Sequence, residues 1–235
     1  MEPIVTIGMP TYNRVEYLPR AINCILSQTY EDFELIIYDD GSSDNTVEIL
    51  EKYNDERLSY VSFENKGPPT PLNYIYKKAK GEFIIILHDH DIFSDALIEK
   101  CVKALKENPQ AGFVLPGGGF VDPDGESNYV EMLDKLPLLN SGRQHLIDIF
   151  SQTNSFNSRF HACSMVRREA LEECGFFYKN KYGFYSDVDL WIRLLEKNDF
   201  LYLKQPLMKF TRREKDHELN DKNVQVTNIL FQIHL

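Results

Sequence analysis

Four ionisable residues, His88-Asp89-His90-Asp91, directly follow an apolar run at positions 83–87. The run is rich in β-branched residues, which predicts a strand buried on both faces, as in parallel sheets. In open α/β sheets, ligands bind beyond the carboxyl ends of the strands. Two carboxylates and two imidazoles there indicate a divalent-cation site, because hard cations take oxygen ligands and manganese-like ions also accept imidazole. The alternative for an isolated Asp-x-Asp is a polar turn that caps a helix.

The composition is that of an ordinary globular protein. With 235 residues, 43% of them hydrophobic and 26% charged, the chain can bury the core of one sizeable domain. Its formal net charge of −10 argues against a nucleic-acid surface, which needs clustered Lys and Arg. An acidic protein can still bind a small anionic ligand where a metal ion supplies positive charge locally.

The four cysteines, Cys24, Cys101, Cys163 and Cys174, show no C-x-x-C pairing, which argues against a zinc site or a disulfide framework. Cys24 and Cys101 fall within helical apolar patterns, so we predict that both are buried as small hydrophobic residues. No basic leader precedes Ile4, and no apolar run approaches the length of a membrane span. We therefore expect a reducing, cytoplasmic location.

The first hundred residues alternate predicted strands and helices. A helix carrying Val47, Leu50 and Tyr53 on one face is expected to be capped by Ser42 or Ser43. Such alternation with short connections predicts an α/β fold with a mostly parallel central sheet and helices on both faces. The other elements are strands at 4–9, 33–38, 58–63 and 83–87 and helices at 15–27, 71–79 and 94–107.

The pattern changes after Gly112. The Gly117-Gly118-Gly119 run and the turn at 122–125 predict a hairpin or loop excursion. A short helix at 168–174 is expected to end at Gly175. The remaining predicted elements are helices at 142–152 and 186–197, a strand at 162–166 and a helical tail at 218–235 that ends abruptly, as at a truncation.

Acidic residues cluster at three places: Asp39-Asp40, Asp89-His90-Asp91, and Asp187 with Asp189. The first two follow predicted parallel strands, whose carboxyl ends share one edge of a sheet, so they should lie in one crevice. Taken singly, residues 39–42 could form only a turn, and Ser186 or Asp187 could only cap a helix. Together, the clusters predict a site assembled from several loops.

Several short blocks occur in order within residues 4–213. They are Pro10-Thr11-Tyr12-Asn13-Arg14, Gln28-Thr29-Tyr30, residues 32–36, Asp39-Asp40-Gly41-Ser42 with 43–46, Gly81-Glu82-Phe83, Arg167-Arg168-Glu169 and residues 186–191. This series resembles family 2 glycosyltransferases of the GT-A fold, a Rossmann-like fold of nucleotide-diphospho-sugar transferases. The resemblance implies one domain over 1–217, with a nucleotide-binding half at about 1–110 and an acceptor-binding half at about 111–217.

The resemblance also implies an activity. It is the metal-dependent, inverting transfer of a hexosyl-type sugar from a nucleotide diphosphate, with uridine as the family preference, to a saccharide or lipid-linked hydroxyl. Cell-surface polysaccharide synthesis is the implied setting. The Gln-x-x-Arg-Trp pattern of processive synthases is absent, which favours transfer of a single sugar. A lipid-linked acceptor would bring the chain to the inner face of the cell membrane by peripheral association.

Particular positions carry the implied roles. Asp39 would accept a hydrogen bond from the nucleobase, and Asp187 falls where the family has its catalytic base. That base must face the sugar from the side opposite the diphosphate, so it should be distinct from the metal cluster. Nucleotide-sugar binding is implied for Pro10, Thr11, Tyr12, Asn13, Arg14, Asp39, Asp40, Gly67, Asn73, Asp89 and His90.

The metal motif departs from the family pattern Asp-x-Asp-Asp. In the register set by the flanking apolar residues, His90 takes the metal-binding Asp position, although Asp89 or Asp91 could serve if the frame shifts. In an extended segment, Asp89 with Asp91 and His88 with His90 are the competing same-face pairs. Imidazole ligates manganese but is a poor partner for magnesium, so we expect Mn²⁺ to be preferred over Mg²⁺.

Other departures concern three further positions. Leu72 stands where many relatives have an arginine near the phosphates, and Ser186 replaces a common acidic residue. His217 could reach the metal from a C-terminal loop, although an exposed loop histidine is usually only solvated. These departures motivate an alternative: a catalytically weakened domain that binds nucleotide or a partner. A sugar-1-phosphate nucleotidyltransferase is disfavoured, because the turn after Met9 contains no glycine-rich phosphate loop.

Overall fold

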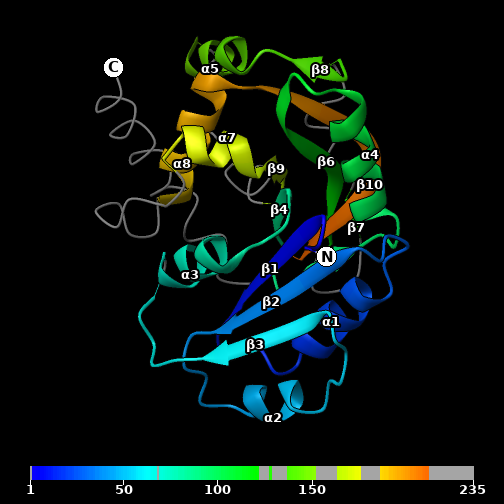
Figure 1. The fold of residues 1–235 in the computed structure, drawn as a ribbon, viewed down its shortest axis with the longest axis vertical. Helices are drawn as coiled ribbons and strands as arrows, with labels where there is room; N and C mark the ends of the chain where they lie inside the picture. The colour runs from blue at the N-terminus through cyan, green and yellow to red at the C-terminus, as the bar shows by residue number, and fades with distance from the viewer. Residues whose placement is uncertain are drawn as a thin grey trace.

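A large twisted sheet organises the computed structural model, which describes residues 2–67, 69–121, 127–128, 137–151, 163–175 and 186–211. The sheet has ten strands, eight of them in the order β3-β2-β1-β4-β9-β6-β10-β5, with β7 beside β6 and β8 beside β10 (Figure 1). Helices α1 and α4 lie on one side of the sheet, and α3, α7 and α8 lie on the other. The expected α/β architecture is confirmed.

The four N-terminal strands form the parallel ladder predicted from the sequence. They are β1 (Val5–Thr11), β2 (Phe33–Asp39), β3 (Leu58–Ser62) and β4 (Phe83–Ile86). In the register of the ladder, Thr11 lies opposite Asp39, and Asp39 lies opposite Ser62. The carboxyl ends of these strands therefore meet at one edge, and the acidic residues that follow β2 and β4 are brought to it.

The helices between these strands are α1 (Leu18–Leu26), α2 (Thr46–Leu50), α3 (Thr70–Lys78) and α4 (Leu97–Glu107). The expectation that Ser42 or Ser43 caps α2 is wrong. Asp44 accepts hydrogen bonds from the Thr46 amide (3.1 Å) and hydroxyl (2.5 Å), while the Ser42 hydroxyl donates to Asp39. A carboxylate two residues before the first helical turn thus replaces the expected serine.

The glycine run at 117–119 lies inside a strand, so the expected excursion begins later than predicted. Strand β6 (Ala111–Val121) pairs in parallel with β10 (Asp199–Thr211). A Cβ atom at Gly117 would lie 2.5 Å from the Leu203 carbonyl oxygen, so the strands approach too closely there for a side chain. A hairpin does follow, because β7 (Ser127–Asn128) pairs antiparallel with β6; its turn lies outside the described residues.

Strand β10 was not predicted, and it completes the site edge. The polar stretch 204–206 interrupts its apolar pattern, and the register with β6 shifts there. Its last residues pair antiparallel with β5 (Ile92–Phe93), Lys209 lying opposite Ile92. The end of the described chain is thereby placed beside the 88–91 segment.

The rest of the C-terminal half is mixed rather than purely parallel. Strand β9 (Met165–Arg167) is antiparallel to both β4 and β6, and β8 (Leu139–Asn140) is antiparallel to β10. Helices α5 (Gly142–Ser151), α7 (Arg168–Glu173) and α8 (Ser186–Lys197) lie near their predicted positions. Gly175 has a φ of 84° after α7, which confirms its predicted stop. The predicted tail at 218–235 lies outside the described residues.

The buried hydrophobic residues of the described chain form one core cluster, and its C-terminal part is centred on three aromatic rings. The Trp191 ring from α8 lies 5.5 Å from Phe113 of β6, and Phe113 stacks on Phe200 of β10 at 5.3 Å. Cys101 is fully buried as predicted, and burial raises the pKa of its thiol to about 12; Cys24 is only half-buried. Among the described residues, no helix has both the length and the apolar character needed to cross a membrane.

Candidate functional site

A cavity of about 360 Å³ opens at the carboxyl edge of β1, β2 and β4. Five residues not assigned to the site from the sequence also line it: Pro71, Leu72, His88, Phe210 and Thr211. The predicted residues among its lining are Pro10, Thr11, Tyr12, Arg14, Asp40, Asp89, His90 and Asp91. The structure therefore brings the start of the loop after β2 and the acidic segment after β4 into one crevice, as the sheet topology predicted, together with the turn after β1.

The turn after β1 is tied to the loop after β2 through Asn13. This residue adopts a positive φ of 51°, which asparagine tolerates better than most residues. Its amide donates to the Ser42 hydroxyl (2.8 Å), and its side-chain oxygen accepts from the Ser43 amide (2.8 Å). Asn13 therefore holds two site loops together and is not itself among the described residues that line the cavity.

Asp39, predicted to contact a nucleobase, is completely buried at the end of β2. One carboxylate oxygen accepts from the Ser42 hydroxyl (2.5 Å) and amide (3.1 Å), and the other accepts from the Ser62 hydroxyl (2.6 Å). A carboxylate has about four acceptor positions, so these contacts orient Asp39 without exhausting its capacity. Its role toward a base stays a prediction.

Asp40 shapes the next wall of the cavity. Its two oxygens accept hydrogen bonds from the backbone amides of Lys66 and Gly67, both at 2.9 Å. The loop after β3 is thereby clamped to the end of β2, and Gly67 has a φ of 66° that favours glycine. Asn73, another predicted site residue, lies in α3 next to Leu72; the described cavity lining includes Leu72 and does not include Asn73.

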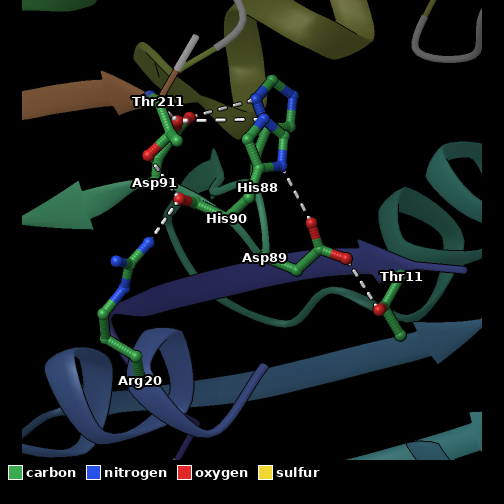
Figure 2. Close-up of polar contacts among 7 residues, drawn as sticks. All are labelled: Thr11, Arg20, His88, Asp89, His90, Asp91 and Thr211. Carbon is green, nitrogen blue, oxygen red and sulfur yellow. Dashed lines mark hydrogen bonds and ion pairs between the residues drawn. The ribbon is translucent and has the colours of Figure 1, made fainter. Parts of the chain in front are cut away.

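Three side chains at the end of β4 converge into a candidate metal centre. His88, His90 and Asp91 each present one ligand atom, and these atoms all lie within 4.8 Å of one another. The two imidazole rings are stacked, 5.6 Å apart and 2° from parallel. His88 Nδ1 lies 3.4 Å from Asp91 Oδ2, and His90 Nε2 lies 3.9 Å from Asp91 Oδ1 (Figure 2).

The donor chemistry of this group fits a divalent cation. Asp91 is almost completely buried, and its Oδ2 atom has no hydrogen-bond partner of normal geometry among the described residues. Burial raises the pKa of Asp91, but the contacts with His88 and His90 and the hydrogen bond from the Thr211 amide outweigh it, so the pKa lies below its usual value. An ionised carboxylate beside two imidazoles is therefore available as a ligand set.

The acidic segment is a turn, which changes its side-chain directions from those expected for an extended segment. The Asp91 amide donates to the His88 carbonyl at 3.4 Å. As a result, the candidate ligand group matches neither of the two expected pairs. His88 and His90 both face Asp91, while Asp89 points toward Thr11 (Figure 2). From the sequence, His88 was named only as the same-face alternative with His90, at the first position of the Asp-x-Asp-Asp register.

Among the described residues, two arginines from the segment 14–20 lie at the cavity or beside it. Arg14 lines the cavity, and the Arg20 guanidinium of α1 donates to the His90 carbonyl at 2.7 Å. Sequence reasoning missed Arg20, because nothing in a helical pattern indicates which distant carbonyl an arginine will reach. Leu72, which stands where the family resemblance implies an arginine, lines the cavity.

The two acids at the start of α8 differ in their environment. Asp189 is completely buried and accepts from the Arg193 guanidinium at 2.7 Å, so it stabilises the helix. Asp187, the predicted catalytic base, is half-buried and accepts from the Val188 amide at 2.8 Å. The cavity lining, drawn only from the described part of the chain, does not include Asp187. His217 lies outside the described residues.

With the site geometry in view, the chain can be compared with known proteins. A family model described as "Glycosyl transferase family 2" matches residues 6–175. The chain belongs to this family. An "uncharacterized glycosyltransferase" of Rickettsia felis is 31% identical over 240 residues, covering 99% of this chain and 38% of the relative. The chondroitin synthase of Pasteurella multocida is 34% identical over 125 residues, covering 52% of this chain and 13% of that protein.

Solved structures confirm the GT-A fold of this family 2 glycosyltransferase. S. aureus TarS 1–349 in complex with UDP aligns with a TM-score of 0.73 at 20% identity, covering 94% of this chain and 64% of that chain. The mannosyltransferase PcManGT from Pyrobaculum calidifontis, in complex with GDP-Man and Mn²⁺, aligns with a TM-score of 0.66 at 18% identity, covering 92% and 59%. The chain thus spans under two thirds of the length of each of these four proteins.

Proposed function

We propose that this family 2 glycosyltransferase moves a single sugar from a nucleotide-diphosphate donor, a UDP-sugar, to a hydroxyl of a saccharide or lipid-linked acceptor. The observation that carries the proposal is one cavity that joins the loops of Thr11 and Asp40 to the metal-ligating group of His88, His90 and Asp91. TarS structures in complex with UDP and with UDP-GlcNAc support the choice of uridine. Cell-surface polysaccharide synthesis is the proposed setting.

In this proposal the donor nucleotide lies along the carboxyl ends of β1 and β2. Asp39 accepts a hydrogen bond from the base, and Thr11 and Asp40 position the nucleoside beside the Pro10–Arg14 turn. Arg14 is a cationic residue of the described cavity lining, and in this proposal it faces the anionic part of the donor. His88, His90 and Asp91 would hold a divalent cation, with Mn²⁺ preferred; when bound, such a cation acts as a Lewis acid on a departing diphosphate.

Asp187 is the proposed general base. The acceptor hydroxyl gives its proton to the Asp187 carboxylate while its oxygen forms the new bond to the anomeric carbon, and the bond from that carbon to the diphosphate breaks on the opposite face. Inversion follows from this in-line geometry. Asp187 suits the role better than Asp189, because Asp189 is completely buried in its contact with Arg193.

The test of this mechanism is sugar-nucleotide turnover with Mn²⁺. UDP release from a panel of UDP-sugars should be measurable, and Asp187→Asn should lower kcat by about 10²–10⁴-fold. UDP affinity should stay unchanged in this variant. Glu169→Gln is the matched control, because Glu169 is an exposed acid in the first turn of α7 and should leave kcat unchanged. Full activity in Asp187→Asn would refute the assignment.

The same assay addresses the alternative of a nucleotide-binding module without catalysis. Leu72 in the cavity wall and His90 in place of a carboxylate favour that alternative. Tight UDP binding without turnover of any UDP-sugar or GDP-sugar would support it.

The proposed organisation has a nucleotide-binding half near 1–110 and an acceptor-binding half near 111–217. With a lipid-linked acceptor, the chain would work at the inner face of the cell membrane by peripheral association.

A further inference from the structure

Asp89 lies next to the candidate metal centre, but its carboxylate is bound to other groups. Its Oδ2 atom accepts from the Thr11 hydroxyl at 2.7 Å, and its Oδ1 atom lies 2.9 Å from His90 Nδ1 (Figure 2). An ionised carboxylate only accepts hydrogen bonds, so His90 Nδ1 carries the hydrogen in this contact. The lone pair of a neutral His90 is therefore at Nε2.

This tautomer directs His90 toward the metal-ligating group. His90 Nε2 is the atom that lies 3.9 Å from Asp91 Oδ1, and the ring is held parallel to His88. The Arg20 guanidinium and the Thr211 hydroxyl both donate to the His90 carbonyl at 2.7 Å, which fixes the backbone of the same residue. A ligating histidine whose second ring nitrogen donates to a carboxylate is a recurrent arrangement in metal sites.

We infer that this chain binds a transition-metal ion through His88, His90 and Asp91 in the absence of nucleotide, with Asp89 as a positioning residue anchored by Thr11. The inference rests on the proposed metal dependence of the site and deepens it. Three protein side chains already lie within 4.8 Å of one another, so diphosphate oxygens are not needed to assemble the ligand set. Two imidazoles favour cobalt-like and manganese-like ions over magnesium.

Co²⁺ alone is the probe, because it reports its coordination by visible absorption. Titration of the full chain with CoCl₂, without nucleotide, should give a visible spectrum that saturates at one ion per chain. His88→Gln should abolish that spectrum. Asp89→Ala should weaken Co²⁺ binding about 10–100-fold, the usual effect of losing a residue that orients a ligand. Asp89→Asn should recover part of the loss, since its amide oxygen can still accept the His90 hydrogen.

Thr11→Val tests the anchor separately and should weaken Co²⁺ binding in the same direction by a smaller factor. His145→Gln is the matched control, because His145 lies on α5 against Phe200, outside the cavity lining, and should bind Co²⁺ as the native chain does. Circular dichroism of each variant confirms folding. If His88→Gln fails to fold, the order of Co²⁺ affinities among the native chain, Asp89→Asn and Asp89→Ala still tests the inference.

No Co²⁺ spectrum without nucleotide would overturn the inference, and so would native affinity in Asp89→Ala. These outcomes are separable from failure of the proposed function. Sugar transfer with Mn²⁺ but no Co²⁺ binding to the free chain would overturn only this inference. Co²⁺ binding with the expected variant ranking, but no transfer from any nucleotide-sugar, would overturn only the proposed activity.

Discussion

At the scale of single residues, the candidate metal centre is distinguished by two imidazoles beside a single carboxylate. His88 and His90 contribute two of the three ligand atoms gathered around Asp91. Sites built from oxygen ligands bind both Mg²⁺ and Mn²⁺, whereas imidazole ligands favour Mn²⁺ over Mg²⁺. Metal preference is therefore the property that these two residues should control most directly.

His90→Asp tests this control. In the native chain we expect kcat/KM with Mn²⁺ to exceed that with Mg²⁺ by about tenfold or more, and His90→Asp should narrow the ratio because it restores an oxygen ligand. The measurement is UDP release at saturating concentrations of each metal. His90→Ala serves as the control, since it should lower activity with both ions. Equal activity of the native chain with both metals would contradict the role of His90.

At the scale of elements, the site depends on loops that are held by backbone contacts. Asp40 accepts the amides of Lys66 and Gly67, so the loops after β2 and β3 form one wall. Gly41 sits between them with a φ of 78°, and a Cβ atom there would lie 2.7 Å from the Asn65 amide nitrogen. Gly67 also has a positive φ, but a Cβ atom there would meet nothing within 4 Å.

These two glycines provide a matched pair of variants. Gly67→Ala should lower the free energy of unfolding by about 1–2 kcal/mol, the usual cost of a side chain at positive φ. Gly41→Ala should cost at least about 1 kcal/mol more, because its methyl group also overlaps the neighbouring backbone. Urea unfolding of both variants measures the difference. If both variants lose the same free energy of unfolding, the backbone near Asn65 can move away from a methyl group at position 41 without a measurable cost in stability.

At the scale of the whole molecule, the metal-ligating turn is held by segments from opposite ends of the chain. Arg20 of α1 and Thr211 of β10 both donate to the His90 carbonyl, and the Thr211 amide donates to Asp91. The contacts from Thr211 therefore depend on the pairing of β10 with β6 and β5. Ligands that bind at this edge should stabilise the entire fold, because they bind the native state alone.

A thermal-shift measurement tests this coupling. UDP with Mn²⁺ at about 100 times the dissociation constant should add about 2.7 kcal/mol of stability, which corresponds to roughly 5–10 °C in Tm for a chain of this size. Removal of the metal with a chelator should abolish most of the shift. An identical shift from UDP with or without Mn²⁺ would argue against a metal bridge between the centre and the diphosphate.

Much of the fold was predictable from local pattern. Strand β4 is a continuous apolar run, β1 and β2 are rich in apolar residues, and the helices α1, α3 and α4 have a helical apolar period, so these elements could be assigned without tertiary information. Strand β10 could not be assigned in this way, because Lys204-Gln205-Pro206 interrupts its apolar pattern and its pairing partners β6, β5 and β8 lie far away in the sequence. The glycines at 117–119 were expected to form a loop because glycine is common in turns. In the structure, the absence of side chains at Gly117 and Gly118 instead allows β10 to approach β6 closely.

The sequence by itself determined which chemical groups meet at the sheet edge, since parallel strands place their carboxyl ends together whatever follows them. Asp40 and the acidic segment after β4 were located in this way, and the family resemblance added the turn at Pro10–Arg14. Only the tertiary structure decided that Asp91 gathers both histidines while Asp89 orients one of them. Side-chain directions in a turn depend on contacts from elsewhere in the chain, and the amide that fixes Asp91 belongs to Thr211, 120 positions away.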